Sequence, residues 1–310
     1  MAGQSLCVAL TGATGFVGRH ILAKLLEAGH TVRALVRDRS KLATKDARVA
    51  AVQGDLFDAA ALAELVKGAD AVIHTVGIIM EKRRQGQTFR RVHVEGTGHL
   101  LDAARAAGRV RKWVQMSALG TRPDAVSTYH RTKWEAEELV HSSGFDYTIF
   151  RPSIIHGPDG EFMQMVKSFW CKWFPPFVPY FGGGAMGKKG AGRLQPVHVD
   201  DVARCCVEAL LNPKASHETY PMGGPQVYTW PELYRAVGPH LPEARKKKIV
   251  AVPVWFARIL AGKPGVPFNM DQVIMSQEDS TCETFKVRGD FGIELKAFEP
   301  MVKDYAGSIK

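Results

Sequence analysis

The chain has 310 residues, of which 45% are hydrophobic and 23% are charged, values that exclude a disordered or fibrous protein. The formal net charge is +10, but the basic residues are spread along the sequence, which argues against a nucleic-acid-binding protein. The five cysteines have no metal-ligand spacing, so the sequence predicts neither a metal site nor a disulfide framework.

Short apolar runs and helical segments alternate through the first half of the chain. In chain order we predict a strand at Leu6–Leu10, a helix at Phe16–Ala28, strands at Thr31–Val36 and Arg48–Gln53, a helix at Ala59–Lys67, a strand at Ala71–Thr75, a helix at Val94–Ala107, a strand at Lys112–Met116, a helix at Tyr129–Ser142 and a strand at Tyr147–Phe150. This alternation predicts βαβ units, and hence an α/β fold with a doubly wound parallel sheet of the Rossmann type.

The pattern changes after Arg151-Pro152, where aromatic and proline residues become frequent. A strand is predicted at Pro196–Val199, and Asp200 is placed to cap a following helix. We therefore predict a dinucleotide-binding domain at 1–160 with 194–212. A small, largely C-terminal substrate lobe is predicted at 161–193 with 213–310.

A glycine-rich segment follows the first predicted strand and opens the first predicted helix. Gly12 allows a tight turn, Gly15 lets backbone N–H groups approach a pyrophosphate, and Gly18 lets the helix pack closely on the sheet. The helix N-terminus favours an anion. The spacing is G-x-x-G-x-x-G, but the strand–turn–helix context is the one that a dinucleotide site requires.

The residues after the second predicted strand bear on the choice of cofactor. Arg37 takes the first position, followed by Asp38 and Arg39. A guanidinium there can bind the 2′-phosphate of NADP, whereas a carboxylate can bind the 2′-hydroxyl of NAD. We favour NADP(H) over NAD(H), with Asp38 as the argument for NAD(H).

A tyrosine and a lysine lie four residues apart in the predicted helix after the fifth strand. Tyr129 and Lys133 would share one helix face, and the ammonium would lower the pKa of the phenol. Ser117, at the end of the fifth strand, would polarise a substrate carbonyl. On this helix of a Rossmann unit the pair indicates proton transfer coupled to hydride transfer.

Together these motifs resemble the short-chain dehydrogenase/reductase superfamily over nearly the whole chain. The resemblance lies in residues 11–18, Ser117, the Tyr129/Lys133 pair, Arg151-Pro152-Ser153 and residues 195–203. In finer detail the chain resembles the atypical branch that contains the nucleotide-binding accessory subunit of respiratory complex I and its bacterial relatives.

The resemblance implies roles for matching positions. The pyrophosphate would be surrounded by the turn and the first helical residues, the 2′-phosphate would meet the residue after the second strand, and three further segments would line the adenine, the ribose and the nicotinamide. The implied cofactor residues are Gly12, Thr14, Gly15, Phe16, Val17, Gly18, Arg37, Asp55, Leu56, Thr75, Val76, Gly77, Lys133, Pro152, Ser153, Ile154 and Ile155, and the implied catalytic residues are Tyr129, Lys133 and Ser117.

Two functions remain open from the sequence. The first is an NADP(H)-dependent oxidoreductase that transfers hydride between the nicotinamide and a carbonyl or alcohol of an unknown small molecule. The second is a non-catalytic accessory or regulatory protein that holds NADPH, in association with a respiratory complex. An RNA-associated member of the superfamily is favoured by the charge alone.

The sequence also bears on membrane association. No apolar run reaches the roughly 18 residues of a membrane span, and strand-like residues begin at Leu6, so we expect a soluble protein of the cytoplasm or an organelle matrix. The aromatic run 169–177 and the run 249–260, which follows the basic residues Arg245–Lys248, are typical of a membrane interface. We favour the interpretation that both runs close the core of the lobe, and we keep weak, reversible peripheral association as the alternative hypothesis.

Overall fold

The computed structural model describes residues 5–42, 44–182, 191–263, 266 and 268–309. It divides into two compact units, the first made of 1–151, 199–221 and 285–293, and the second of 152–198, 222–284 and 294–310. The segments 213–221 and 285–293, which the sequence assigned to the lobe, are grouped with the first unit, because they supply a strand and a helix to it. Residues 183–190 of the predicted lobe lie outside the described residues.

The first unit is built on a seven-stranded sheet with the order β10-β6-β5-β4-β1-β2-β3. The recorded pairings from β3 to β6 are all parallel. The strands are β1 (Cys7–Thr11), β2 (Thr31–Val36), β3 (Val49–Gln53), β4 (Ala71–His74), β5 (Lys112–Met116), β6 (Asp146–Pro152) and β10 (Glu218–Met222). The predicted α/β fold of the Rossmann type is confirmed.

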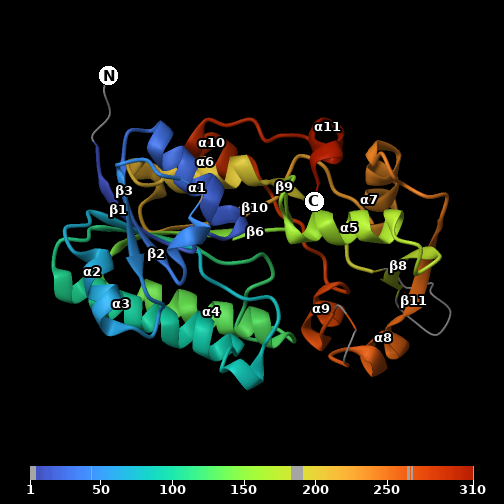
Figure 1. Ribbon diagram of the computed structural model, residues 1–310, viewed down its shortest axis with the longest axis horizontal. Helices are drawn as coiled ribbons and strands as arrows, with labels where there is room; N and C mark the ends of the chain where they lie inside the picture. The colour runs from blue at the N-terminus through green and yellow to red at the C-terminus, as the bar shows by residue number, and fades with distance from the viewer. Residues whose placement is uncertain (1–4, 43, 183–190, 264–265, 267, 310) are drawn as a thin grey trace. The chain divides into compact units, whose positions relative to one another are not determined.

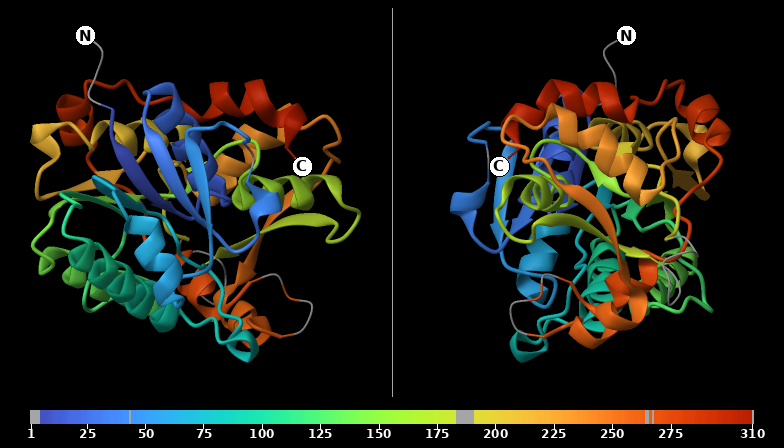
Figure 2. Two further views of the ribbon diagram at one scale, coloured as in Figure 1. Left: turned by 60° about the vertical axis from the view of Figure 1, so that its left-hand side comes forward. Right: turned by 90° about the vertical axis from the view of Figure 1, so that its right-hand side faces the viewer.

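Helices cover both faces of this sheet (Figure 1). One layer contains α1 (Phe16–Glu27), α6 (Val199–Glu208) and α10 (Phe285–Phe291), and the other contains α2 (Ala59–Val66), α3 (Gly96–Ala107) and α4 (Thr128–His141). The left view of Figure 2 shows the two layers on either side of the strands. Because both faces are covered, the central strands are largely apolar: Val8, Leu10 and Ile73 are fully buried.

The structure differs from the predicted elements in two places near the candidate site. The helix predicted from Val94 is preceded by a π-helical segment at Arg90–Glu95, which no periodicity in the sequence indicates. Asp200 does not cap α6 but lies in its first turn. Its carboxylate is 2.8 Å from His20 Nδ1 of α1, in keeping with the preference of helix N-termini for negative charge.

The second unit contains shorter elements around a core of its own. It has β7 (Ile155–His156) paired with β9 (Val197–His198), β8 (Phe177–Gly182) paired with β11 (Lys248–Pro253), and the helices α5 (Glu161–Cys171), α7 (Trp230–Val237), α8 (Val254–Leu260), α9 (Met270–Met275) and α11 (Phe298–Tyr305). Met163, Leu233 and Phe298 are fully buried in this core.

Short 3-10 helices occur at Arg39–Lys41, Arg83–Gln85, Pro213–Ala215, Gly238–His240 and Ala306–Ser308. Within the described ranges, no helix has both the length and the apolar character needed to cross a membrane.

Candidate functional site

The glycine-rich turn after β1 has the geometry that the sequence predicts. Gly12 has φ +79°, and a Cβ atom there would lie 2.4 Å from Thr75 Oγ1. A Cβ on Gly18 would lie 2.0 Å from the carbonyl oxygen of Gly12, so only glycine lets α1 pack this closely on the turn. The Gly15 N–H donates to the Gly12 carbonyl at 2.9 Å, which closes the turn.

The N-terminus of α1 is arranged to receive an anion. Its N-cap residue, Gly15, has no side chain to accept from the first-turn N–H groups, and the first turn contains no acid. Thr14 lies in the turn, and Phe16 and Val17 are the first two helical residues. The N–H groups of this end and the positive end of the helix dipole favour a phosphate group.

The residues after β2 bear on which side chain, Arg37 or Asp38, is available to contact the adenosine ribose of the cofactor. Asp38 caps the 3-10 helix at 39–41: its Oδ1 accepts from the Ser40 N–H at 2.9 Å and the Ser40 hydroxyl at 2.7 Å. These hydrogen bonds lower the pKa of Asp38. Arg37 is exposed directly after the strand. The structure therefore commits one carboxylate oxygen of Asp38 to the loop and leaves Arg37 facing solvent.

The ends of β3 and β4 place the next predicted residues. Asp55 Oδ1 accepts from the Phe57 N–H at 2.8 Å, which orders the loop, and Leu56 is buried. The Thr75 hydroxyl donates to the carbonyl of Thr11 at 2.7 Å, so the end of β4 is tied to the end of β1. Val76 is half-buried and Gly77 exposed after this contact.

Lys133 is the residue that brings three elements together. Its ammonium donates to the Met116 carbonyl at the end of β5, at 3.0 Å, and it lies 3.1 Å from the position of a Cβ on Gly77 after β4. The side chain is buried, and burial lowers the pKa of Lys133 to about 8, although the nearby Glu137 opposes this shift. Arg151 binds Glu137 through Nε at 3.0 Å.

Tyr129 lies one turn before Lys133 on α4, and its ring is held by other rings. The ring centroids of His93 and Phe89 are 5.4 Å and 5.8 Å away, both edge-to-face. Burial raises the pKa of Tyr129 to about 12, so the expected lowering by Lys133 is wrong. The physical reason is that burial removes the phenolate from water, which disfavours the charged form.

His93 packs against Tyr129 as part of the candidate site, and the sequence analysis did not predict it. Its Nδ1 lies 2.9 Å from Thr132 Oγ1, and its Nε2 lies 3.2 Å from the Ile78 N–H after β4. Burial holds the pKa of His93 well below its ordinary value, so the ring is neutral at pH 7. The π-helical segment at 90–95 places the ring here, and a sequence pattern could not have indicated it.

The remaining predicted residues fall in different surroundings. Ser117 follows β5 and is buried, with its hydroxyl 3.4 Å from Thr121 Oγ1. Pro152 ends β6. Ser153 belongs to the second unit, where its hydroxyl lies 2.9 Å from that of Ser280. The places predicted for Pro152, Ser153, Ile154 and Ile155 beside the nicotinamide remain predictions.

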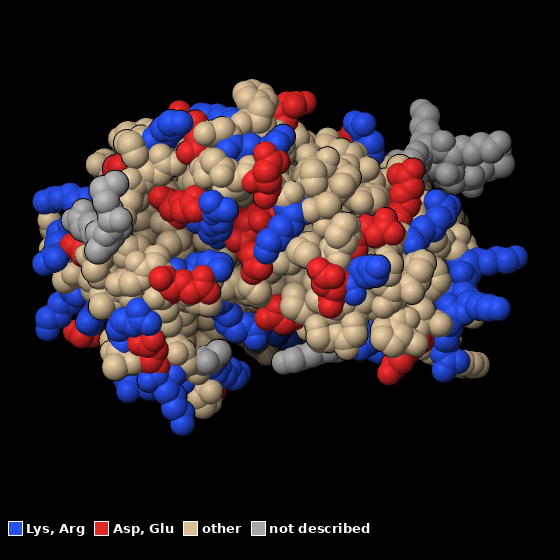
Figure 3. All heavy atoms as spheres, turned by 90° about the horizontal axis from the view of Figure 1, so that it is seen from above, with Lys and Arg blue, Asp and Glu red and all other residues tan. Residues whose placement is uncertain are grey.

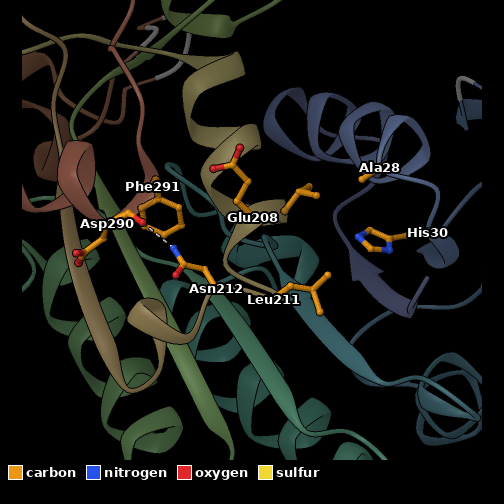
Figure 4. A pocket seen from close by; sticks show the side chains of 8 residues that line it. Ala28, His30, Glu208, Leu211, Asn212, Asp290 and Phe291 are labelled. Atoms are coloured by element: carbon orange, nitrogen blue, oxygen red, sulfur yellow. Dashed lines mark hydrogen bonds between the residues drawn. The ribbon is translucent and has the colours of Figure 1, made fainter. Parts of the chain in front are cut away.

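A hollow of about 430 Å³ lies elsewhere on the first unit (Figure 4). It is lined by His30, Asn212, Asp290 and Phe291, among others. His30 directly precedes β2, so the hollow lies at the opposite edge of the sheet from the residues above. Its polar groups serve the fold: His30 Nδ1 accepts from the Leu6 N–H at 3.2 Å, and Asn212 donates to the Asp290 carbonyl at 2.9 Å.

The chain is similar in sequence to known proteins that are consistent with a dinucleotide-binding site. Residues 12–167, half of the chain, match the NAD(P)H-binding family. The chain is 32% identical over 248 residues to the ceramide reductase of Caulobacter vibrioides, covering 78% of this chain and 72% of that protein. It is 27% identical over 300 residues to the mitochondrial NADH-ubiquinone oxidoreductase 40 kDa subunit of Neurospora crassa, covering 91% and 74%.

The fold has solved counterparts as well. The crystal structure of the Bordetella bronchiseptica enzyme WbmH in complex with NAD+ matches with a TM-score of 0.72 at 22% identity, covering 98% of this chain and 97% of that one. The glycine turn, the strand ends and these similarities lead to one conclusion. The chain belongs to the NAD(P)H-binding family, and it resembles the atypical short-chain dehydrogenase/reductases, among them the complex I subunit of Neurospora crassa.

Proposed function

We propose that this protein is an NADPH-dependent reductase of a carbonyl substrate, with Tyr129 as the proton donor. The observation that carries the proposal is that Lys133 contacts the residues after β4 and β5, while Tyr129, one turn earlier on α4, packs against His93, which accepts a hydrogen bond from Ile78 after β4. The glycine turn supports cofactor binding, because Gly12 and Gly18 let the turn and α1 pack closely, which sets the N-terminus of α1 at the end of β1.

The protonation state of Tyr129 favours reduction. A phenol with a pKa of about 12 keeps its proton at pH 7, so it donates to the oxygen of a carbonyl as that oxygen gains negative charge. A bound reduced nicotinamide supplies the hydride to the carbonyl carbon. The products would be the alcohol, the oxidised nicotinamide and a Tyr129 phenolate, which regains its proton from solvent.

Lys133 and Ser117 have different roles in that transfer. The ammonium of Lys133 stabilises the phenolate while it exists, an interaction that burial strengthens. Ser117 orients the carbonyl oxygen toward Tyr129, and Lys133 also holds the nicotinamide ribose. Arg37 selects NADPH over NADH through the 2′-phosphate, since Asp38 is engaged by Ser40.

The substrate class comes from the relatives. One of them is named ceramide reductase and another is named NAD(P)H azoreductase. We therefore choose carbonyl compounds with long acyl chains as the first class to test, with azo compounds as the second.

The test is NADPH oxidation by the purified full chain, followed at its absorbance band, with both substrate classes. Turnover with a carbonyl compound, reduced at least about 100-fold in Tyr129→Phe, is the expected result. Turnover that is unchanged in Tyr129→Phe would show that another group donates the proton.

A second function is favoured by the similarity to the complex I subunit of Neurospora crassa. In this case the chain holds NADPH as a structural or regulatory group. Tight NADPH binding in calorimetry, with no oxidation by any substrate of either class, would establish this function in place of the first.

A further inference from the structure

A cluster of exposed basic and aromatic residues lies on the second unit, in two segments far apart in the sequence. Trp173 is 79% exposed and Phe174 is 73% exposed, the two highest values among the exposed large hydrophobic residues. Lys172 precedes them and is also exposed. We call the set of Lys172, Trp173, Phe174, Arg245, Lys246 and Lys248 the basic aromatic patch.

The two segments are held together by hydrogen bonds to the backbone. Lys247 Nζ donates to the carbonyls of Phe169 at 2.7 Å and Pro175 at 2.9 Å, and Arg245 Nε donates to the Cys171 carbonyl at 3.0 Å. Beyond them β8 and β11 pair in parallel, with Lys248 opposite Phe177. Lys172 to Phe174 and Arg245 to Lys248 therefore lie side by side at the start of this strand pair.

The patch is not part of the core of its unit. Phe169, Trp170 and Ile249 from the same two runs pack against that core, whereas Trp173 and Phe174 do not. Each run therefore divides into a part that packs on the core and a part that is exposed, so neither run as a whole closes the core of the lobe. Two adjacent large aromatic side chains in water are the kind of exposed apolar surface that marks a site of interaction.

The charge of the patch is strongly positive. The segments 169–177 and 241–248 contain five basic residues and one acid, Glu243. Within the part of the chain that the structure describes, Lys172, Lys246 and Lys248 form no ion pair. In Figure 3 several Lys and Arg side chains project from the right-hand edge of the second unit.

We propose that the basic aromatic patch binds the surface of an anionic lipid bilayer. Exposed Lys and Arg side chains beside Trp and Phe have the composition of an interfacial site: the charges meet lipid headgroups and the rings enter the boundary with the acyl chains. The excess positive charge favours a bilayer with anionic lipids over a neutral one. This inference does not depend on the proposed reductase activity.

A second exposed group on the same unit provides a comparison. Trp255 and Ile259 of α8 are 58% and 54% exposed, but α8 follows the other end of β11. A strand of six residues spans roughly 20 Å, so α8 lies well away from the patch. Arg258 is the one basic residue in α8, which leaves this group without the charge that anionic lipids recognise.

The experiment is co-sedimentation of the full chain with vesicles of phosphatidylcholine, alone or mixed with phosphatidylserine. We expect binding to the mixed vesicles only, reduced by salt. The variant Lys172→Gln/Lys246→Gln/Lys248→Gln should bind about 100-fold more weakly, at about fivefold per basic residue. Lys67→Gln/Lys82→Gln/Arg84→Gln removes the same charge from exposed positions of the first unit and should bind within about twofold of the unaltered protein.

The aromatic half of the patch is tested by fluorescence. Brominated acyl chains should quench part of the tryptophan emission, and Trp173→Phe should lose that quenched part, whereas Trp255→Phe should retain it. Thermal melting of each variant checks that it is folded.

Three results would overturn the proposal: no binding to mixed vesicles at low salt, equal weakening in the first-unit control, or quenching unchanged in Trp173→Phe. A fourth is a dimer in sedimentation analysis that Trp173→Ser/Phe174→Ser dissociates, which would make the patch an interface between two copies.

Discussion

The two ends of the predicted cofactor site differ in how far they are removed from water. At the buried end, Lys133 and His93 are 5% and 1% exposed, and burial shifts the pKa of both. At the exposed end, Arg37 and Asp38 lie in solvent after β2. The buried end can therefore carry chemistry that needs strong electrostatics, whereas the exposed end can contribute only a screened, selective contact.

The largest effect is expected from a substitution at the buried end of the predicted cofactor site. Tyr129→Phe removes the proton donor and should reduce kcat by about 10²- to 10⁴-fold, with NADPH affinity unchanged in calorimetry. The matched control is Tyr147→Phe on β6, where the ring packs against His141 and His217. A control that loses activity to the same extent would contradict the role of Tyr129.

The second prediction uses the pKa of Lys133. It falls from 10.5 to about 8 on folding, so between these pH values the unfolded chain binds a proton that the folded chain does not. The free energy of unfolding should rise with pH across this window, by up to about 3 kcal/mol, relative to Lys133→Met. Urea denaturation at pH 7, 8, 9 and 10 measures it, and parallel curves for the two proteins would refute it.

The third prediction concerns the exposed end. Arg37→Ala should weaken NADPH binding by about 1.5 kcal/mol, at the low end of the range for a charged hydrogen bond because water screens the site. NADH binding should not change. Arg84→Ala, an exposed arginine elsewhere on the first unit, is the control for net charge. Equal losses for the two cofactors would remove the argument for NADPH.

The smallest effect is expected for Asp38→Asn. Because Ser40 already holds one oxygen of this carboxylate, the ratio of NADPH to NADH affinity should change by no more than about 0.5 kcal/mol. A loss of NADH binding alone would show that Asp38 serves the ribose hydroxyl and would shift the preference toward NAD(H). Titration of each cofactor by intrinsic fluorescence decides between these outcomes.

The sequence by itself determined the Rossmann sheet and the positions at its carboxyl edge. Gly12, Arg37 and Ser117 could be placed because each directly follows an apolar run, and the carboxyl ends of neighbouring parallel strands meet at one edge. Tyr129 and Lys133 could be placed on one face because helical spacing is local. These inferences depend only on neighbours in the chain.

Only the tertiary structure decided the rest. The direction in which the pKa of Tyr129 shifts depends on how far the side chain is buried. His93 is placed against that tyrosine by a π-helical segment. The strand pair β8 and β11 joins segments about 70 residues apart, as its register records, and that pairing brings the basic run at 245–248 beside the aromatic run that contains Trp173. Desolvation and non-local pairing depend on atoms distant in sequence, so no local pattern of residues can report them.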